Sequence, residues 1–252
     1  MMYRISKYSI ITASKLLPCV PLEWWHGLRN RAVLKDVLKK LAINCVLDVG
    51  GNTGQYGRRL RQIGYHGHII SFEPIMASYE ILKASAAKDE NWSVFPYALG
   101  GVNEKKEINV MAATDLSSFL VPREDSQNRF KQNRVERKEE VQVWRLDNIL
   151  DTCLDMEAHP RLYLKLDTQG FDLSVMEGAQ NIIPKILGLQ TEISLHNIYH
   201  GMPSFLESIS KFQSYGFNVI DFVTLTRERD KLSAIEMDCI MVNRNLKQNN
   251  QK

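Results

Sequence analysis

The sequence predicts an α/β fold whose core is a doubly wound, mostly parallel sheet of about seven strands. Short apolar runs that are typical of buried strands alternate with amphipathic runs of helical period along most of the chain. This alternation indicates βαβ units, which build parallel sheets. No helical run separates the last two strand-like segments, 217–225 and 235–244, so we expect an antiparallel hairpin at the sheet edge.

Length and composition indicate one large domain. The chain has 252 residues, 44% of them hydrophobic, which is enough for a sizeable core. We expect a helical N-terminal extension over 1–42, the sheet domain over 43–245 and a frayed tail over 246–252. No apolar run approaches the length of a transmembrane helix. The basic and aromatic residues of the extension would also suit peripheral contact with a membrane surface.

Local patterns place the elements of the first half. Apolar residues recur at helical spacing within 32–41, with lysines between them. Gly64 is a suitable helix stop, and Pro74 closes a strand-like run. The expected strands are 44–49, 67–74 and 91–100, and the expected helices are 32–41, 53–64 and 77–89.

In the second half of the chain the strand–helix alternation is interrupted. Two strands of alternating character, 105–111 and 139–146, flank a polar, highly charged stretch, so we expect a lid-like insertion over 112–140. Its charges fit either a solvated face or a lid that recruits an anionic or glycosylated acceptor. Asp147 is a suitable N-cap for the next helix. The remaining expected strands are 161–167, 186–195 and the hairpin, and the expected helices are 148–156, 173–183 and 202–216.

Charge and cysteine content narrow the class of protein. A net charge of +3 gives no global basic field, so no nucleic-acid partner is expected. The four cysteines lie far apart without a C-x-x-C pair, which predicts neither a zinc knuckle nor a redox motif. Cys45 and Cys239 lie in apolar, strand-like runs, so we expect them to be free thiols in the core. A reducing, cytoplasmic setting is the simplest one for such thiols. Nothing in the sequence fixes the oligomeric state.

A glycine-rich turn after the first strand predicts a cofactor site. Asp48 ends that strand, and Gly50, Gly51 and Gly54 follow, where missing Cβ atoms let the backbone approach a ligand. The G-x-G-x-x-G spacing of dinucleotide folds is absent. An acid before the glycines suits the cationic amino-acid end of S-adenosylmethionine, directly or through water. Glu73, at the end of the second strand, can accept both ribose hydroxyls, as it could from a nicotinamide cofactor.

Three interpretations of this turn therefore stand side by side. The first-strand acid, the glycine spacing and the closing hairpin together favour an S-adenosylmethionine enzyme. A nicotinamide-dependent oxidoreductase could be built on the same sheet plan. The glycines could also form a tight turn with no ligand, leaving Glu73 in solvent.

The residues between 43 and 243 resemble the FkbM family of S-adenosylmethionine-dependent methyltransferases. VLDVGGNTGQY, which includes Asn52, resembles the cofactor loop, and SFEP, which ends in Pro74, resembles the ribose-binding strand end. VFPYALG would place Ala98 and Leu99 near the adenine. The resemblance implies a class I, Rossmann-like methyltransferase fold. It also implies a hydroxyl acceptor on a small molecule, sugar or glycan-linked metabolite.

The same resemblance points to the acceptor side of the site. LSSF, with Ser117 and Ser118, resembles a recurring serine-bearing stretch, which we assign to acceptor binding. LKLDTQGFDLSVMEGA is the most specific match, but Gln169, which we also assign to acceptor binding, stands where the family usually has Glu. A neutral amide keeps hydrogen bonding and loses charge, so a non-catalytic relative that binds cofactor or glycan is a further alternative.

Three residues are candidates for catalysis. Asp167 ends the fourth strand of the alternating pattern, where it could act as base, orient a ligand, or simply cap the next helix. Glu192 lies at the end of the following strand and could equally be a satisfied strand-end acid. His196, just beyond it, is the other candidate base. His196 and His200 have the spacing of metal ligands, but the Gly- and Pro-flanked segment makes a metal site unexpected.

Overall fold

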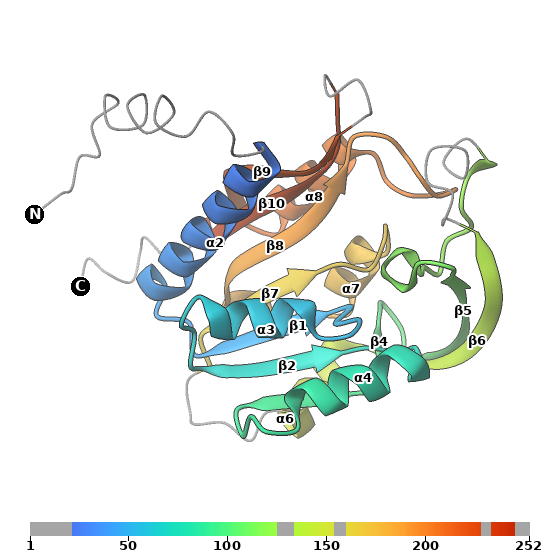
Figure 1. Ribbon diagram of the computed structural model, residues 1–252, viewed down its shortest axis with the longest axis horizontal. Helices are drawn as coiled ribbons and strands as arrows, with labels where there is room; N and C mark the ends of the chain where they lie inside the picture. The colour runs from blue at the N-terminus through green and yellow to red at the C-terminus, as the bar shows by residue number, and fades with distance from the viewer. Residues whose placement is uncertain (1–21, 125–133, 154–159, 228–232, 245–252) are drawn as a thin grey trace, which may run out of the picture.

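The computed structural model describes residues 22–124, 134–153, 160–227 and 233–244 (Figure 1). The predicted tail over 246–252, the first residues of the N-terminal extension and part of the lid-like insertion lie outside the described residues. The predicted domain boundaries therefore stay predictions. Within the described residues, no helix has both the length and the apolar character needed to cross a bilayer.

The main sheet confirms the predicted fold class. It has seven strands in the order β3-β2-β1-β7-β8-β10-β9. All neighbours pair in parallel except β10, which lies antiparallel between β8 and the edge strand β9. The strands are β1 (Cys45–Val49), β2 (His68–Phe72), β3 (Trp92–Phe95), β7 (Leu162–Leu166), β8 (Ile186–Ser194), β9 (Phe217–Arg227) and β10 (Ala234–Asn243).

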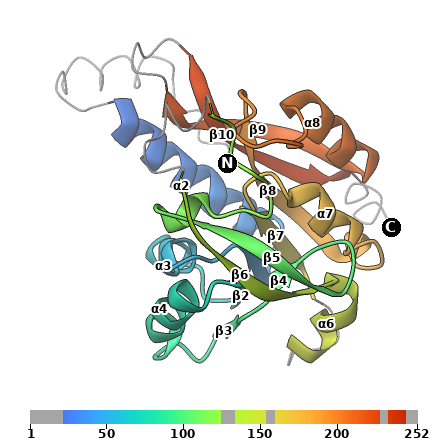
Figure 2. The same cartoon turned by 90° about the vertical axis from the view of Figure 1, so that its right-hand side faces the viewer.

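Helices cover both faces of this sheet (Figures 1 and 2). The helices are α2 (Leu22–Lys40), α3 (Gln55–Gln62), α4 (Met76–Ala86), α6 (Leu146–Cys153), α7 (Asp172–Glu177) and α8 (Phe205–Ser214). Helices α2, α3 and α4 bury their apolar residues with Val46 and Ile69, on one face. Helices α6, α7 and α8 pack with Leu47 and Leu164, on the other. The alternation of side chains along β1 thus supplies two cores, and the layers confirm the doubly wound plan.

The predicted third strand, 91–100, is wrong as one element. It is divided into β3 of the main sheet and β4 (Ala98–Leu99), which joins a second sheet. Pro96 lies at the break and has no N–H to donate to a sheet partner. The second sheet, in the order β4-β6-β5, also contains β5 (Glu104–Met111) and β6 (Val135–Trp144) (Figure 2).

The helix boundaries that differ from prediction include those of α6 and α7. Helix α6 begins at Leu146, so Asp147 lies in its first turn and is not its N-cap. The Oδ1 atom of Asp147 accepts instead from the backbone N–H of Asn181, at 3.0 Å. Helix α7 ends at Glu177, and Gly178 follows it. A Cβ at Gly178 would lie 2.0 Å from the backbone oxygen of Gly100, so this position requires glycine.

Candidate active site

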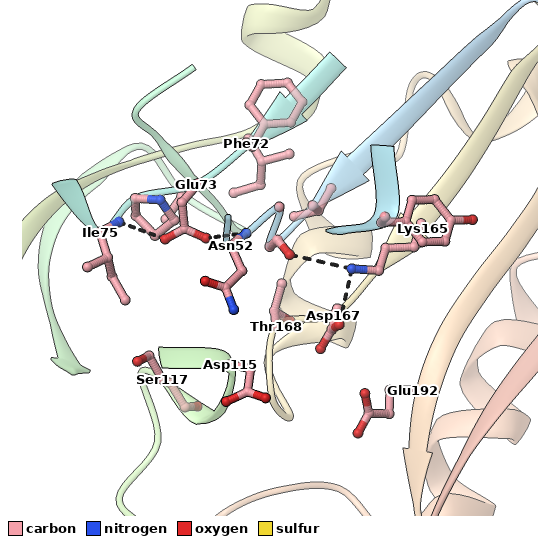
Figure 3. Close-up of a pocket in the computed structure, with 18 of the residues that line it drawn as sticks. Asn52, Phe72, Glu73, Ile75, Asp115, Ser117, Lys165, Asp167, Thr168 and Glu192 are labelled. Atoms are coloured by element: carbon pink, nitrogen blue, oxygen red, sulfur yellow. Dashed lines mark hydrogen bonds and ion pairs between the residues drawn. The ribbon is translucent and has the colours of Figure 1, made fainter. Parts of the chain in front are cut away.

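A cleft of about 290 Å³ opens at the carboxyl ends of β1, β2, β7 and β8 (Figure 3). This is the edge of a doubly wound sheet at which ligands bind. The start of the lid-like insertion, around the 3-10 turn η1 (Thr114–Leu116), forms part of the wall. Of the predicted cofactor residues, the cleft is lined by Gly50, Gly51, Asn52, Glu73, Pro74, Ala98 and Leu99.

The glycine turn brings the ends of β1 and β7 into contact. Gly50 has φ +80°, and a Cβ there would lie 2.1 Å from the backbone oxygen of Asp167. The N–H groups of Gly50 and Gly51 both donate to the backbone oxygen of Phe72, at 3.0 Å. Gly54 has φ +88° and precedes α3, outside the cleft lining. Glycine is therefore required at position 50 by sterics as well as by backbone angle.

Glu73 lies at the cleft wall with both oxygens already bonded (Figure 3). Its Oε2 accepts from the N–H of Asn52 at 2.8 Å, and its Oε1 accepts from the N–H of Ile75 at 2.9 Å. Burial raises the pKa of Glu73 to about 7, although these two amides oppose the shift. Each carboxylate oxygen retains a lone pair. The group can therefore still accept hydrogen bonds from a ribose diol.

Beside Glu73 the cleft has an apolar slot. Phe72, Ile75, Ala98 and Leu99 line it, with Ile108 on β5. All five side chains are buried in the fold, which makes the slot rigid. A slot of this kind suits a planar base next to a sugar.

Asp48 does not line the cleft, which corrects the expected contact with the cationic end of the cofactor. Its side chain points into the sheet face below α3, opposite Ser71 on β2 and Lys165 on β7. Ser71 Oγ donates to Asp48 Oδ2 at 2.9 Å, and Lys165 Nζ lies 3.4 Å from Asp48 Oδ1. The acid before the glycines is fully buried and pairs with a lysine of the protein.

Lys165 connects this buried acid to the cleft. Its Nζ lies 3.1 Å from Asp167 Oδ2 and 5.2 Å from the centre of the Tyr56 ring. Burial alone would lower the pKa of Lys165, but the carboxylates of Asp167 and Asp48 outweigh it and raise that pKa above its ordinary value. The lysine is therefore charged, and its two carboxylate partners flank the turn.

Asp167 lines the cleft with its side chain 32% exposed. Its Oδ1 accepts from Gln169 Nε2 at 3.1 Å, which complements the ion pair at Oδ2. Asp167 does not cap α7. The residue before that helix is Phe171, and Asp172 accepts from the backbone N–H of Thr168 instead.

Gln169 lies behind Asp167 and outside the cleft lining. It has φ +51°, and Tyr199 Oη donates to its Oε1 at 3.1 Å. An amide fits here because one end must donate to Asp167 while the other accepts from Tyr199. Ser118 Oγ donates to the backbone oxygen of Gln169 at 2.8 Å, and Ser117 Oγ accepts from the N–H of Met111. Both serines line the cleft, and their hydroxyls already hold neighbouring backbone.

Glu192 lines the cleft, and His196 does not. Burial, followed by the charges of Asp167 and Glu236, raises the pKa of Glu192 well above its usual range. The ionised form of Glu192 is therefore disfavoured. His196 and His200 are exposed beyond β8, away from the lining. Across the described ranges, no three His, Cys, Asp or Glu side chains are grouped for a metal ion.

Several cleft residues were not predicted. Gln190 and Asp238 line the cleft, and each interrupts an apolar strand, which is a readable signal of a polar site. Arg59 reaches the lining one helical turn after Gln55, where its charge alone gives no sign of function. Asp115 lies in the lid-like insertion, and no local pattern distinguishes it from the neighbouring charges.

Comparisons with known proteins bear on this geometry. A family model described as the methyltransferase FkbM domain matches residues 48–219. No curated protein matches the sequence. Precorrin-6y C5,15-methyltransferase from Geobacter metallireducens GS-15 is 9% identical, with a TM-score of 0.44 over 84% of this chain and 86% of that chain. Fibrillarin from Aeropyrum pernix, with bound S-adenosyl-L-methionine, is 13% identical and has a TM-score of 0.44. The match covers 79% of this chain and 66% of that chain.

Magnesium protoporphyrin IX methyltransferase from Synechocystis PCC 6803, also with bound cofactor, is 7% identical, with a TM-score of 0.45 over 85% and 79%. Structural similarities this weak carry no argument about function. The family match, in contrast, spans the glycine turn, Glu73 and Asp167, and it removes the nicotinamide-dependent alternative. The chain therefore belongs to the FkbM family of S-adenosylmethionine-dependent methyltransferases.

Proposed function

We propose that this methyltransferase acts on a hydroxyl group of a small molecule, sugar or glycan-linked metabolite. The observation that carries the proposal is the polar lining of the cleft beyond the glycine turn. Asp115, Asp167, Gln190, Glu192 and Asp238 all line that part. Carboxyl and amide groups at several positions can exchange hydrogen bonds with several hydroxyls at once. An acceptor rich in hydroxyls fits this wall better than an apolar one, which would remove these polar groups from water without adding a hydrogen bond.

The cofactor fits the other part of the cleft. The apolar slot suits adenine, Glu73 has lone pairs for the ribose hydroxyls, and the turn at Gly50 and Gly51 lines the cleft beside them. When bound, S-adenosylmethionine supplies an electrophilic methyl group on a sulfonium. The task of the protein is to hold the acceptor oxygen in line with that methyl group, which can lower the barrier by about 7 to 11 kcal/mol.

We assign proton removal to Asp167. Lys165 and Gln169 fix its two oxygens by one contact each, so a lone pair on each oxygen remains for the acceptor. As the acceptor oxygen takes the methyl group and the methyl–sulfur bond breaks, with the thioether as leaving group, Asp167 would accept the hydroxyl proton on one of its Oδ atoms. Glu192 lines the same part of the cleft, so its carboxyl group can exchange a hydrogen bond with a second acceptor oxygen. His196 has no part in this scheme.

Transfer of a labelled methyl group tests the proposal. The purified enzyme and cofactor are incubated with a metabolite extract of the source cell, and the labelled product is identified by mass spectrometry. We expect an ether, and label in RNA or on nitrogen would contradict the acceptor class. Asp167→Asn should lower turnover by about 100-fold or more with an unchanged Tm. Asp151→Asn, at an exposed position of α6, is the matched control and should keep full activity.

Near-normal turnover by Asp167→Asn would remove this residue from the chemistry. The non-catalytic alternative, which the Gln169 departure raised, makes a different prediction. A non-catalytic relative would bind S-adenosylhomocysteine and release no labelled product with any acceptor. The two assays together separate an incorrect base assignment from an incorrect function.

A further inference from the structure

The cleft contains one cation without a partner. Among the described residues, two basic side chains line it, Lys165 and Arg59. Lys165 is neutralised by Asp48 and Asp167. Arg59 is half-buried, and among the described residues its guanidinium has neither a hydrogen-bond partner nor an ion-pair partner. A half-buried guanidinium without an acceptor is costly, which makes Arg59 a candidate for ligand binding.

The position of Arg59 follows from the turn and the helix after it. Helix α3 begins directly after the glycine turn, and Gln55, Tyr56 and Arg59 all line the cleft. Tyr56 Oη donates to Gln190 Oε1 of β8 at 2.9 Å, so this face of α3 lies over the β8 side of the sheet. Glu73 follows β2, and β1 and β7 lie between β2 and β8 in the sheet order. Arg59 and the ribose-binding acid therefore belong to opposite ends of the cleft.

The surrounding charges limit what Arg59 can bind. Asp167, Glu192 and Asp238 line the same part of the cleft and would repel or compete with an anionic ligand. A carboxylate entering this end needs a positive partner, and Arg59 is the one cation of the described lining not already paired. A guanidinium offers a planar fork of donors that matches a carboxylate in bidentate geometry.

We propose that Arg59 binds a carboxylate at the β8 end of the cleft. The inference rests on the S-adenosylmethionine site described above, because that cofactor carries a carboxylate at the end opposite its adenosine. An acceptor with an acidic group is the second source of the same chemistry. In either case Arg59 favours a ligand that carries a negative charge. The other titratable groups of this cleft are mainly acidic.

Calorimetry with paired ligands distinguishes the two sources. The first pair is S-adenosylhomocysteine and its decarboxylated analogue S-adenosyl-3-thiopropylamine, which lacks the carboxylate alone. The second pair is D-glucuronate and D-glucose, each titrated in the presence of saturating S-adenosylhomocysteine. The variants are Arg59→Gln, Arg59→Lys and the control Arg31→Gln. Arg31 is an exposed arginine of α2 and lies outside the cleft lining.

If the cofactor supplies the carboxylate, Arg59→Gln should weaken S-adenosylhomocysteine about ten-fold or more and leave the decarboxylated analogue unchanged. Arg59→Lys should recover part of the loss. If the acceptor supplies it, the cofactor affinities stay unchanged and glucuronate alone loses affinity. Unchanged affinity for all four ligands in Arg59→Gln would overturn the proposal. A wild-type chain that fails to bind S-adenosylhomocysteine would instead contradict the cofactor site itself, and this subsite with it.

Discussion

Replacement of Glu73 by Gln should change how stability depends on pH. Burial raises the folded-state pKa of Glu73 to about 7, from an ordinary value of 4.5. An acid whose folded pKa is raised binds a proton more tightly in the folded state than in the unfolded state. Between the two values the unfolded chain is ionised and the folded chain is protonated, so stability falls as pH rises. The full cost, present above the folded pKa, is about 3 kcal/mol.

Most of this loss of stability occurs within a pH range in which unfolding can be measured. Linkage predicts that Glu73 lowers the free energy of unfolding by about 2 kcal/mol between about pH 5.5 and about pH 8.5. Glu73→Gln removes that contribution, although it also leaves one of the N–H groups of Asn52 and Ile75 without its acceptor. The lost hydrogen bond shifts the stability of the variant by a nearly constant amount, so the difference between the two proteins isolates the titration.

Urea denaturation of both proteins at the two pH values measures this difference. The variant should gain about 2 kcal/mol relative to wild type from the lower to the higher pH. It should also lose S-adenosylhomocysteine affinity at about pH 8.5, where wild-type Glu73 is ionised, because a neutral amide is a weaker acceptor for two hydroxyls than a carboxylate. Glu80→Gln, at an exposed position of α4, should change neither property. Parallel stability curves for wild type and Glu73→Gln would refute the burial of an ionisable carboxyl at this site.

Three further substitutions test the neighbouring contacts. Gly50→Ala should destabilise the fold by about 2 to 4 kcal/mol in urea, because its Cβ would lie 2.1 Å from the oxygen of Asp167; equal stability would contradict the tight turn. Lys165→Met should cost about 3 to 5 kcal/mol in urea denaturation, since it leaves Asp48 buried without its cationic partner; a cost below about 1 kcal/mol would contradict the buried ion pair. Gln169→Glu should lower kcat, because a carboxylate replaces the amide that donates to Asp167 Oδ1. Unchanged kcat would show that this contact does not position Asp167 for turnover.

Local patterns were sufficient for most of the fold. Strands β1, β2 and β7 are short apolar runs buried on both faces, and the helices between them have clear period and stops. The division of 91–100 was missed because the run reads as continuously apolar on either side of Pro96. Its two parts join different sheets, and such pairing depends on β6, a strand distant in sequence.

The site was predictable where strand ends determine it, and less so elsewhere. Glu73 and Asp167 line the cleft as expected, because parallel strands end at one edge. The sequence did not show which way the side chain of Asp48 points. It lies on the α3 side of β1, where it pairs with Lys165 from the neighbouring strand β7. Arg59 was missed because a helix face, and not a strand end, brings it to the cleft.

A crystal structure of the enzyme with S-adenosylhomocysteine tests the central claim most directly. We predict the ribose hydroxyls at Glu73, the adenine against Ala98 and Leu99, and the amino-acid end beyond Gly50. Adenosine density elsewhere on the chain, or a cleft at Gly50 and Glu73 that remains empty at saturating ligand, would contradict the proposed site.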